Sequence, residues 1–254
     1  MSVRIWLIDY TDADLDQLES AKKISSQDTL ELSTAACSEV RLQNIVRDIS
    51  LRHALSQEYA LPFDEWSFAK SDLGKPFLRN IGFEHLKFSV SHSAKHLAII
   101  LASGGNPLLS NVGIDVEPIS RSGQAEKLKN EFLSEGELSI VNRMPEQEIA
   151  NVILKHWTLK ESISKAVGLG LGLPFSSITL RAVDQSQPQI ISFADNNLYE
   201  PSEFHLKSYE PKPGLQLAYC IQGPYYGDEQ PQTTNLNFSE VLKFQKLMPI
   251  LQCA

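Results

Sequence analysis

The chain has 254 residues, a formal net charge of −8 and the composition of an ordinary globular protein. This length allows one large domain or two modest ones. The acidic balance argues against a nucleic-acid-binding protein and against binding to an anionic membrane, because affinity for phosphate-rich surfaces comes mainly from Lys and Arg.

The cysteines and the apolar runs indicate the cellular compartment. Cys37, Cys220 and Cys253 are widely separated and lack the short spacings of zinc or redox motifs. We therefore expect reduced thiols. The apolar runs are too short for a signal peptide or a membrane span, which predicts a cytoplasmic protein with no membrane partner.

The first part of the chain is predicted to contain one strand and two helices. The strand covers residues 3–8, a polar helix covers residues 12–23, and a longer helix runs from residue 34 to residue 59. Apolar residues recur along the longer helix as a broken stripe, as in an amphipathic helix. Pro62 ends this pattern, since proline lacks the backbone N–H that a helix interior needs.

A stiff turn is predicted at Gly74-Lys75-Pro76. Proline restricts the residue before it to extended conformations, so Lys75 is held at the apex of the turn. A lysine held in this way can bind an anion, although a solvated turn lysine is the simpler alternative.

Residues 88–101 read as a strand, a polar turn and a second strand. Ser91, His92 and Ser93 form the polar part, and we expect a recognition turn there rather than a tight hairpin. A hydrogen-bonded histidine without a functional role is the alternative. A serine nucleophile is not expected, because no Gly-x-Ser-x-Gly motif surrounds these residues.

The stretch Val-Gly-Ile-Asp-Val-Glu, residues 112–117, has apolar residues at every second position and predicts a strand. We expect it to be the third strand of an antiparallel meander that begins at residue 88. Asp115 and Glu117 share its other face, about 7 Å apart. Two carboxylates at this distance in a cleft favour a cation, and their hard oxygen atoms suit Mg²⁺. A strand whose outer face is simply solvated is the alternative.

The second half is predicted to open with short helices at residues 126–132 and 136–144, followed by a strong helix at residues 145–167. In this strong helix Trp157, Glu161 and Lys165 lie four residues apart, on the face opposite the apolar stripe, with Lys160 at the margin. An exposed Glu–Lys pair is the alternative, but a tryptophan on that face indicates that the face is covered. Further strands are predicted at residues 177–183, 189–193, 204–209 and 215–221, and an amphipathic segment at 238–251.

Five motifs together resemble the 4'-phosphopantetheinyl transferase superfamily, most of all its single-chain surfactin-synthetase-activator type. They are Gly74-Lys-Pro, Phe88-Ser-Val-Ser-His-Ser, Val112-Gly-Ile-Asp-Val-Glu, Phe132-Leu-Ser-Glu-Gly-Glu and Trp157-Thr-Leu-Lys-Glu-Ser-Ile-Ser-Lys. The resemblance implies an α+β fold of two similar, pseudo-twofold-related lobes, each an antiparallel sheet packed with a long helix. The expected lobes are residues 1–117 and 118–254.

The resemblance also implies an activity. The phosphopantetheine arm of coenzyme A would be transferred to a serine of an acyl or peptidyl carrier protein, with release of adenosine 3',5'-bisphosphate. Asp115, Glu117 and Glu161 would hold Mg²⁺. Glu161 would also act as the general base, and Lys165 would neutralise or protonate the leaving group.

The same resemblance implies the coenzyme contacts. Lys75, Ser91 and His92 would bind the phosphates of coenzyme A, Lys160 would assist, and Arg41 is a candidate for the 3'-phosphate. We expect a monomer that recognises its carrier protein through an apolar patch with a few local lysines. Two alternatives of other classes are a catalytically silent coenzyme A or carrier-protein binding module and a generic Mg²⁺ phosphohydrolase.

Overall fold

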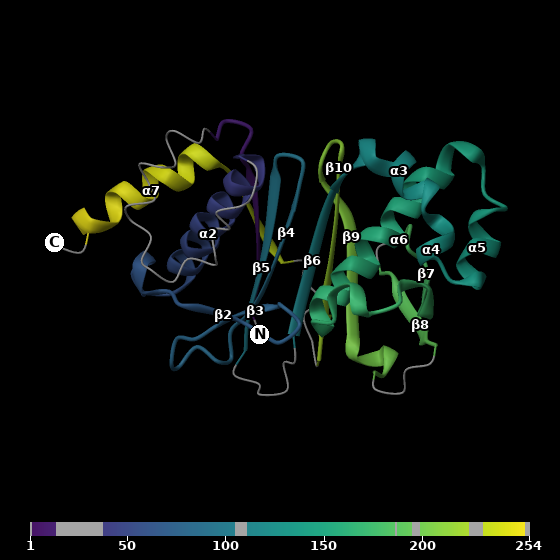
Figure 1. Ribbon diagram of the computed structural model, residues 1–254, viewed down its shortest axis with the longest axis horizontal. Coiled ribbons are helices and arrows are strands. Elements are labelled where there is room, and N and C mark those ends of the chain that lie inside the picture. The colour runs from purple at the N-terminus through teal and green to yellow at the C-terminus, as the bar shows by residue number, and fades with distance from the viewer. Residues whose placement is uncertain are drawn as a thin grey trace. The chain divides into compact units, whose positions relative to one another are not determined.

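A computed structural model describes residues 2–13, 38–104, 111–185, 187–194, 199–223 and 231–251. The protein has an α+β fold in which most strand pairs are antiparallel, as predicted. The chain forms two compact units. We call residues 104–230 the central unit, and residues 2–103 with 231–254 the terminal unit (Figure 1).

The terminal unit contains a four-stranded sheet of order β11-β1-β5-β4. Its strands are β1 (Ser2–Asp9), β4 (Lys87–Ser93), β5 (His96–Ser103) and β11 (Gln232–Asn237). β5 pairs antiparallel with both β1 and β4, whereas β11 pairs parallel with β1. The sheet therefore joins segments from the two ends of the chain.

Two helices and a hairpin complete the terminal unit. Helix α2 (Ser38–Glu58) and helix α7 (Phe238–Leu251) pack together, and a short 3-10 helix, η2 (Phe63–Glu65), follows α2. Strands β2 (Phe68–Lys70) and β3 (Pro76–Leu78) form the hairpin. Helix α2, the sheet and the hairpin all contribute apolar side chains to one hydrophobic core.

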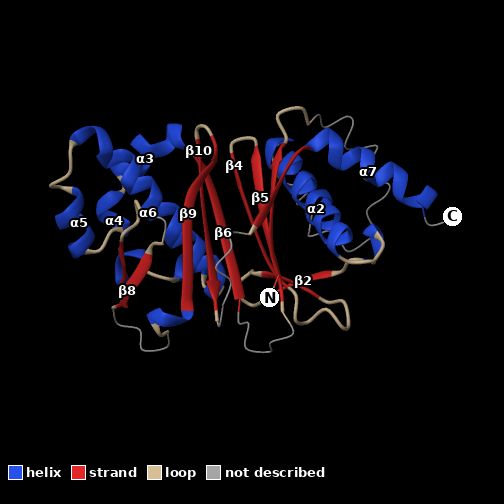
Figure 2. Cartoon of the chain, turned by 180° about the vertical axis from the view of Figure 1, so that it is seen from behind, coloured by secondary structure: helices blue, strands red, loops and turns tan. Residues whose placement is uncertain are grey.

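The central unit contains a three-stranded antiparallel sheet of order β6-β10-β9. Its strands are β6 (Asn111–Pro118), β9 (Phe204–Lys212) and β10 (Leu215–Gln222). Helix α6 (Glu146–Val167) packs against β6 and β10, as the ribbon also shows (Figure 2). Leu159 and Ile163 lie on the buried side of this helix and are fully enclosed.

The rest of the central unit surrounds helix α6. It consists of the helices α3 (Ser122–Lys127), α4 (Lys129–Phe132) and α5 (Glu135–Val141), the hairpin β7 (Ile178–Arg181) and β8 (Gln189–Phe193), and the 3-10 helices η3 (Ile119–Arg121), η4 (Gly170–Gly172), η5 (Phe175–Ser177) and η6 (Pro201–Glu203). None of the described helices is long and apolar enough to cross a membrane.

Several sequence predictions of secondary structure are confirmed. The first strand, the long helix before Pro62 and the strands of the second half occur within a few residues of their expected bounds. Helix α6 begins after Pro145 and ends at Gly168, whose φ of 79° is the left-handed conformation that glycine adopts readily. The helix predicted at residues 12–23 falls almost wholly outside the described residues.

The predicted meander is wrong. Strand β6 pairs with β10, a hundred residues later in the chain, and lies in a different sheet from β4 and β5. The expected recognition turn is also wrong, because Ser91, His92 and Ser93 belong to β4. A tight turn at Ala94 and Lys95 joins β4 to β5, and Ala94 has a positive φ of 50°.

The compact units differ from the expected division after residue 117. Strand β6 belongs to the central unit, where it pairs with β10 and packs against α6. Residues 231–254 belong to the terminal unit, because β11 adds to the sheet through β1. Hydrogen bonds between strands that are distant in sequence therefore set the division.

Candidate functional site

Strand β6 positions two of the predicted site residues. Val112, Ile114 and Val116 share one face of the strand and are completely buried. Asp115 and Glu117 on the other face are also buried, with 4% and 8% of their surface exposed. A solvated outer face is therefore excluded, and the two carboxylates need partners that compensate for lost hydration.

Gly113 explains how helix α6 comes close to these carboxylates. A Cβ atom at this position would collide with the carbonyl oxygen of Ser162 and would lie 2.5 Å from the backbone nitrogen of Ala166. The backbones of β6 and α6 are thus packed more closely than any residue with a side chain would allow. Glycine at this position brings the polar face of α6 to the strand.

Each β6 carboxylate forms an ion pair. The Nζ of Lys165 on α6 lies 2.7 Å from Oδ1 of Asp115. Arg121, just beyond the end of β6, donates through Nη1 to both carboxylate oxygens of Glu117, at 3.0 and 2.8 Å. The spacing on the helix predicted that Lys165 shares a face with Glu161, but its ion pair with Asp115 was not predicted. Arg121 was missed, because no spacing rule links a strand carboxylate to a residue beyond the end of that strand.

Glu161 is the third carboxylate of the cluster. Burial, and to a smaller extent the charges of Asp115 and Glu117, raise the pKa of Glu161 from 4.5 to about 7, although the charge of Lys165 lowers it. These effects mean that the three carboxylates lie within electrostatic reach of one another. Within the described part of the chain, however, no three acidic, histidine or cysteine side chains already stand in metal-binding geometry.

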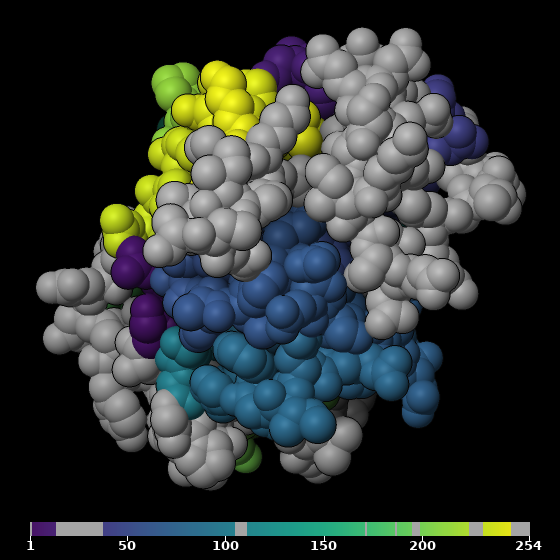
Figure 3. Space-filling model, turned by 90° about the vertical axis from the view of Figure 1, so that its left-hand side faces the viewer, coloured from purple at the N-terminus to yellow at the C-terminus, as the bar shows by residue number. Residues whose placement is uncertain are grey.

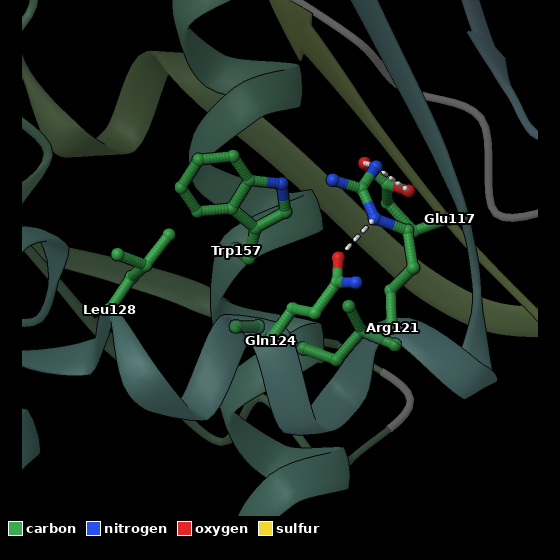
Figure 4. A pocket seen from close by; sticks show the side chains of 7 residues that line it. Glu117, Arg121, Gln124, Leu128 and Trp157 are labelled. Carbon is green, nitrogen blue, oxygen red and sulfur yellow. Dashed lines mark hydrogen bonds and ion pairs between the residues drawn. The ribbon is translucent and has the colours of Figure 1, made fainter.

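The face of α6 that carries Trp157 is partly covered, by side chains of the same half of the chain and not by the other half as expected. The Trp157 ring makes edge contacts with Phe132 and Phe175, at centroid distances of 5.1 and 5.8 Å. One side of the indole lines an open hollow of about 80 Å³ (Figure 4). The hollow is lined by Glu117, Arg121, Gln124, Ala125, Leu128, Leu154 and Trp157.

The structure contradicts the expectation that Lys160 assists in coenzyme binding. Lys160 is completely buried, and its ammonium donates to the carbonyl oxygens of Phe132 and Phe175, both at 2.9 Å, and to Oε2 of Glu137 at 2.5 Å. An ammonium group has three N–H donors, so all of them are used. Burial lowers the pKa of Lys160, and Glu137 raises it again.

Glu137 holds several segments of the central unit together. Its carboxylate accepts hydrogen bonds from the backbone N–H groups of Ser134 and Leu180, at 2.7 and 2.8 Å, besides its bond from Lys160. The first of these belongs to the capping box of α5. Sequence reasoning gave Glu137 no role, although the Ser-x-x-Glu spacing was the signal of a capping box.

The remaining predicted residues belong to the terminal unit. Lys75 is part-exposed beside a turn in which Gly74 has a φ of 84°. Ser91 is buried and His92 is exposed on β4, and Arg41 is part-exposed in the first turn of α2. Their contacts with coenzyme A stay predictions.

Comparison with known proteins shows what the chain is similar to. Residues 111–220 match the model of the 4'-phosphopantetheinyl transferase superfamily. The predicted resemblance is confirmed. This chain is 28% identical to the 4'-phosphopantetheinyl transferase Sfp of Bacillus subtilis (strain 168), over 79% of this chain and 81% of that protein.

Other 4'-phosphopantetheinyl transferases are similar as well. The protein gsp of Aneurinibacillus migulanus is 28% identical over 64% of both chains. The L-aminoadipate-semialdehyde dehydrogenase-phosphopantetheinyl transferase of Saccharomyces cerevisiae is 30% identical over 56% of this chain and 52% of its own. A solved holo-(acyl-carrier-protein) synthase from Bacillus anthracis aligns with a TM-score of 0.37 and 21% identity, over 45% of this chain and 96% of that chain.

The match to the 4'-phosphopantetheinyl transferase superfamily coincides with the carboxylate cluster. Residues 111–220 begin at the start of β6 and include all of α6. The matched segment therefore contains Asp115, Glu117, Glu161 and Lys165.

Proposed function

We propose that the protein is a 4'-phosphopantetheinyl transferase that moves the phosphopantetheine arm of coenzyme A onto a serine of an acyl or peptidyl carrier protein. The observation that carries the proposal is the cluster of Asp115, Glu117, Glu161 and Lys165 in a chain similar to such enzymes. The second product is adenosine 3',5'-bisphosphate. The cluster supplies the proposed metal ligands, the base and the cation for the leaving group. The predicted coenzyme contacts supply the residues that bind the phosphates.

The cluster fits a magnesium ion. Asp115, Glu117 and Glu161 offer hard oxygen atoms, and two of these carboxylates raise the pKa of the third by repulsion, which a divalent cation would relieve. Lys165 and Arg121 neutralise the cluster in the structure described. When bound, Mg²⁺ would neutralise the pyrophosphate and polarise the phosphorus under attack.

Glu161 is the proposed general base. Its pKa is near 7 without a metal, and a bound cation would lower that value, so the carboxylate would be ionised and able to accept a proton at neutral pH. It takes the hydroxyl proton of the carrier serine, directly or through a water molecule. The serine oxygen then forms the new bond to phosphorus, and the bond from phosphorus to the bisphosphate oxygen breaks.

Lys165 is the proposed partner of the leaving group. Its ammonium lies one helical turn after Glu161 and is already held against Asp115. A positive charge there stabilises the bisphosphate as its charge develops. Lys75, Ser91, His92 and Arg41 of the terminal unit are the proposed contacts to the phosphates of coenzyme A.

A catalytically silent binding module is less well supported. Binding coenzyme A or a carrier protein requires neither a carboxyl group with a pKa near 7 nor a lysine paired to a neighbouring carboxylate. Both features are costly to bury, and both suit a reacting centre. The protein is proposed to act as a cytoplasmic monomer.

Incubation with coenzyme A, Mg²⁺ and a panel of apo carrier proteins tests the function. The mass of the intact carrier should increase by one phosphopantetheine group, and chelation of the metal should prevent the increase. Coenzyme binding without any mass increase across the panel would favour the silent module. Phosphate release without a carrier protein would instead favour the phosphohydrolase.

A further inference from the structure

Arg121 holds one of the carboxylates that we propose as metal ligands. Its Nη1 lies 3.0 and 2.8 Å from the two carboxylate oxygen atoms of Glu117. Only 10% of the Glu117 side chain is exposed, so this carboxylate has lost most of its hydration, and the guanidinium compensates for the loss. Hydrogen bonds between charged groups are stronger than those between neutral ones. The oxygen atoms proposed for the metal therefore already interact with a cation of the protein.

Arg121 is less enclosed than the other cation of the cluster. Its side chain is 49% exposed, whereas that of Lys165, which pairs with Asp115, is 27% exposed. The Nε of Arg121 donates to Oε1 of Gln124 at 3.3 Å, which is long for a hydrogen bond. The Arg121 side chain also lines the open hollow of about 80 Å³ shown in Figure 4. The guanidinium thus has room to move away from Glu117.

Binding of a divalent cation would reverse the sign of the charge at the cluster. When they are ionised, the carboxylates of Asp115, Glu117 and Glu161 face two cations. These cations are Lys165 and Arg121, so one negative charge is in excess. Adding Mg²⁺ leaves one positive charge in excess, and like charges in a partly buried site repel one another. An anion that arrives with the metal removes this repulsion.

We propose that Arg121 competes with the metal for Glu117 and moves onto the pyrophosphate of coenzyme A when the metal binds, an inference that rests on the proposed function. The guanidinium suits this exchange, because its planar set of N–H donors pairs with phosphate as well as with carboxylate. Arg121 thereby couples the two binding events. Metal binding is weak in the free protein and becomes tight when the coenzyme is present.

A purely structural ion pair is the alternative. In that case Arg121 only fixes the chain that follows β6, and its loss lowers the stability of the protein equally with and without metal. Competition predicts a different dependence on metal. Loss of Arg121 then lowers stability in the absence of metal, and the metal restores it, because Glu117 again has a cation beside it.

Calorimetric titration with Mn²⁺, as a probe for Mg²⁺, tests the competition. Without coenzyme A, Arg121→Gln should bind Mn²⁺ about three- to fivefold more tightly than the unchanged protein, as expected for loss of one part-exposed ion pair. Coenzyme A should tighten Mn²⁺ binding less in the variant than in the unchanged protein, after subtraction of the metal that free coenzyme binds. Arg121→Lys keeps a cation and should have nearly the unchanged affinity.

Thermal unfolding extends the test to a variant that is less stable. Without metal, Arg121→Gln should unfold at a lower temperature than the unchanged protein, because the buried Glu117 carboxylate loses its cation. Added Mn²⁺ should raise the unfolding temperature of the variant by more than that of the unchanged protein. An equal rise in the two proteins would support the purely structural ion pair.

Arg4→Gln is the matched control. The Nε of Arg4 on β1 lies 3.5 Å from Oε2 of Glu58, and 38% of the Arg4 side chain is exposed. In the space-filling view, purple atoms of the N-terminal segment that contains β1 reach the surface of the terminal unit (Figure 3). The substitution removes a comparable Arg–Glu pair whose carboxylate belongs to no proposed site. It should leave the Mn²⁺ affinity unchanged.

The outcomes separate this inference from the proposed function. If neither the unchanged protein nor Arg121→Gln binds Mn²⁺, with or without coenzyme A, the proposed metal site fails. If the unchanged protein binds Mn²⁺ and transfers the arm, but Arg121→Gln binds Mn²⁺ no more tightly, the competition is overturned. An equal gain in affinity for Arg4→Gln would mean that only the net charge matters, which also overturns it.

Discussion

The Nζ of Lys165 lies 2.7 Å from Oδ1 of Asp115, although the two residues are fifty positions apart in the chain. This ion pair joins helix α6 to strand β6 at the place where Gly113 lets their backbones approach. The strand thereby presents its carboxylates to the polar face of the helix. Three of the predictions below follow from this junction.

Asp115→Asn should abolish measurable transfer. The substitution keeps the size of the side chain but removes one of the proposed metal-binding charges and the ion pair with Lys165. Binding of Mg²⁺ or Mn²⁺ should weaken in parallel, as measured by calorimetry. A variant that binds the metal normally and transfers at the original rate would refute the proposed metal site.

Glu161→Gln should lower kcat far more than it raises the KM for coenzyme A. An amide can still donate and accept hydrogen bonds, but it cannot take the serine proton, and a positioned base contributes about a factor of 10²–10⁴ to the rate. Steady-state kinetics with saturating carrier protein checks this. Equal losses in kcat and in coenzyme affinity would contradict the role as a base.

Gly113→Ala should disrupt the junction of α6 and β6. The new methyl group meets the backbone of Ser162 and Ala166, which cannot move as a side chain can. We expect a loss of stability of about 1–3 kcal/mol, together with reduced transfer. Gly123→Ala is the control, because its Cβ meets no atom within 4 Å, and it should cost nothing in urea denaturation.

Lys160→Met should destabilise the protein without weakening coenzyme binding directly. Removing the ammonium leaves Glu137 charged, buried and without its cation, which costs about 3–5 kcal/mol. Adding Glu137→Gln should recover part of that loss, because the double variant buries no unpaired charge. If Lys160→Met is as stable as the unchanged protein but binds coenzyme A more weakly, then Lys160 does contribute to the coenzyme site.

His53 should make the protein sensitive to acid. Burial lowers the pKa of His53 from 6.5 to about 4 in the folded state, where its ring packs edge-on against Trp6 and Phe244. Between about pH 6.5 and pH 4, the His53 side chain is therefore protonated in the unfolded chain but neutral in the folded protein. The stabilising contribution is present above pH 6.5 and is lost as the pH falls towards 4, by up to about 3 kcal/mol.

His53→Phe isolates that contribution. Phenylalanine keeps a ring against Trp6 and Phe244 but does not titrate. The free energy of unfolding, measured with urea at pH 7 and at pH 4.5, should fall less for the variant than for the unchanged protein. Equal decreases in the two proteins would mean that His53 is already charged when folded.

Local patterns in the sequence were sufficient for the helices and for the facing of the cluster residues within each element, whereas the meeting of Glu161 with Asp115 and Glu117 was implied by the family resemblance. The four-residue spacing of Trp157, Glu161 and Lys165 defined one face of a helix, and the alternation in residues 112–117 placed Asp115 and Glu117 together. The structure then brings Lys165 to Asp115. The spacing of residues within one helix or strand predicts which face each side chain lies on, because that geometry depends only on the local backbone.

Pairing between distant segments could not be predicted in this way. Strand β6 follows β5 in the chain, yet it pairs with β10, and nothing within either strand encodes that choice. The burial of Lys160 has the same origin. It depends on carbonyl groups of Phe132 and Phe175 that only tertiary packing brings within reach.

The parallel pairing of β11 with β1 has a consequence for biosynthesis. On the ribosome, β1 emerges more than two hundred residues before its partner Gln232–Asn237. At about 5–20 residues per second, the nascent chain spends roughly ten to forty seconds with one edge of β1 open to other polypeptides. Slower translation lengthens that window, so chaperone supply and growth temperature should govern the soluble yield of this protein.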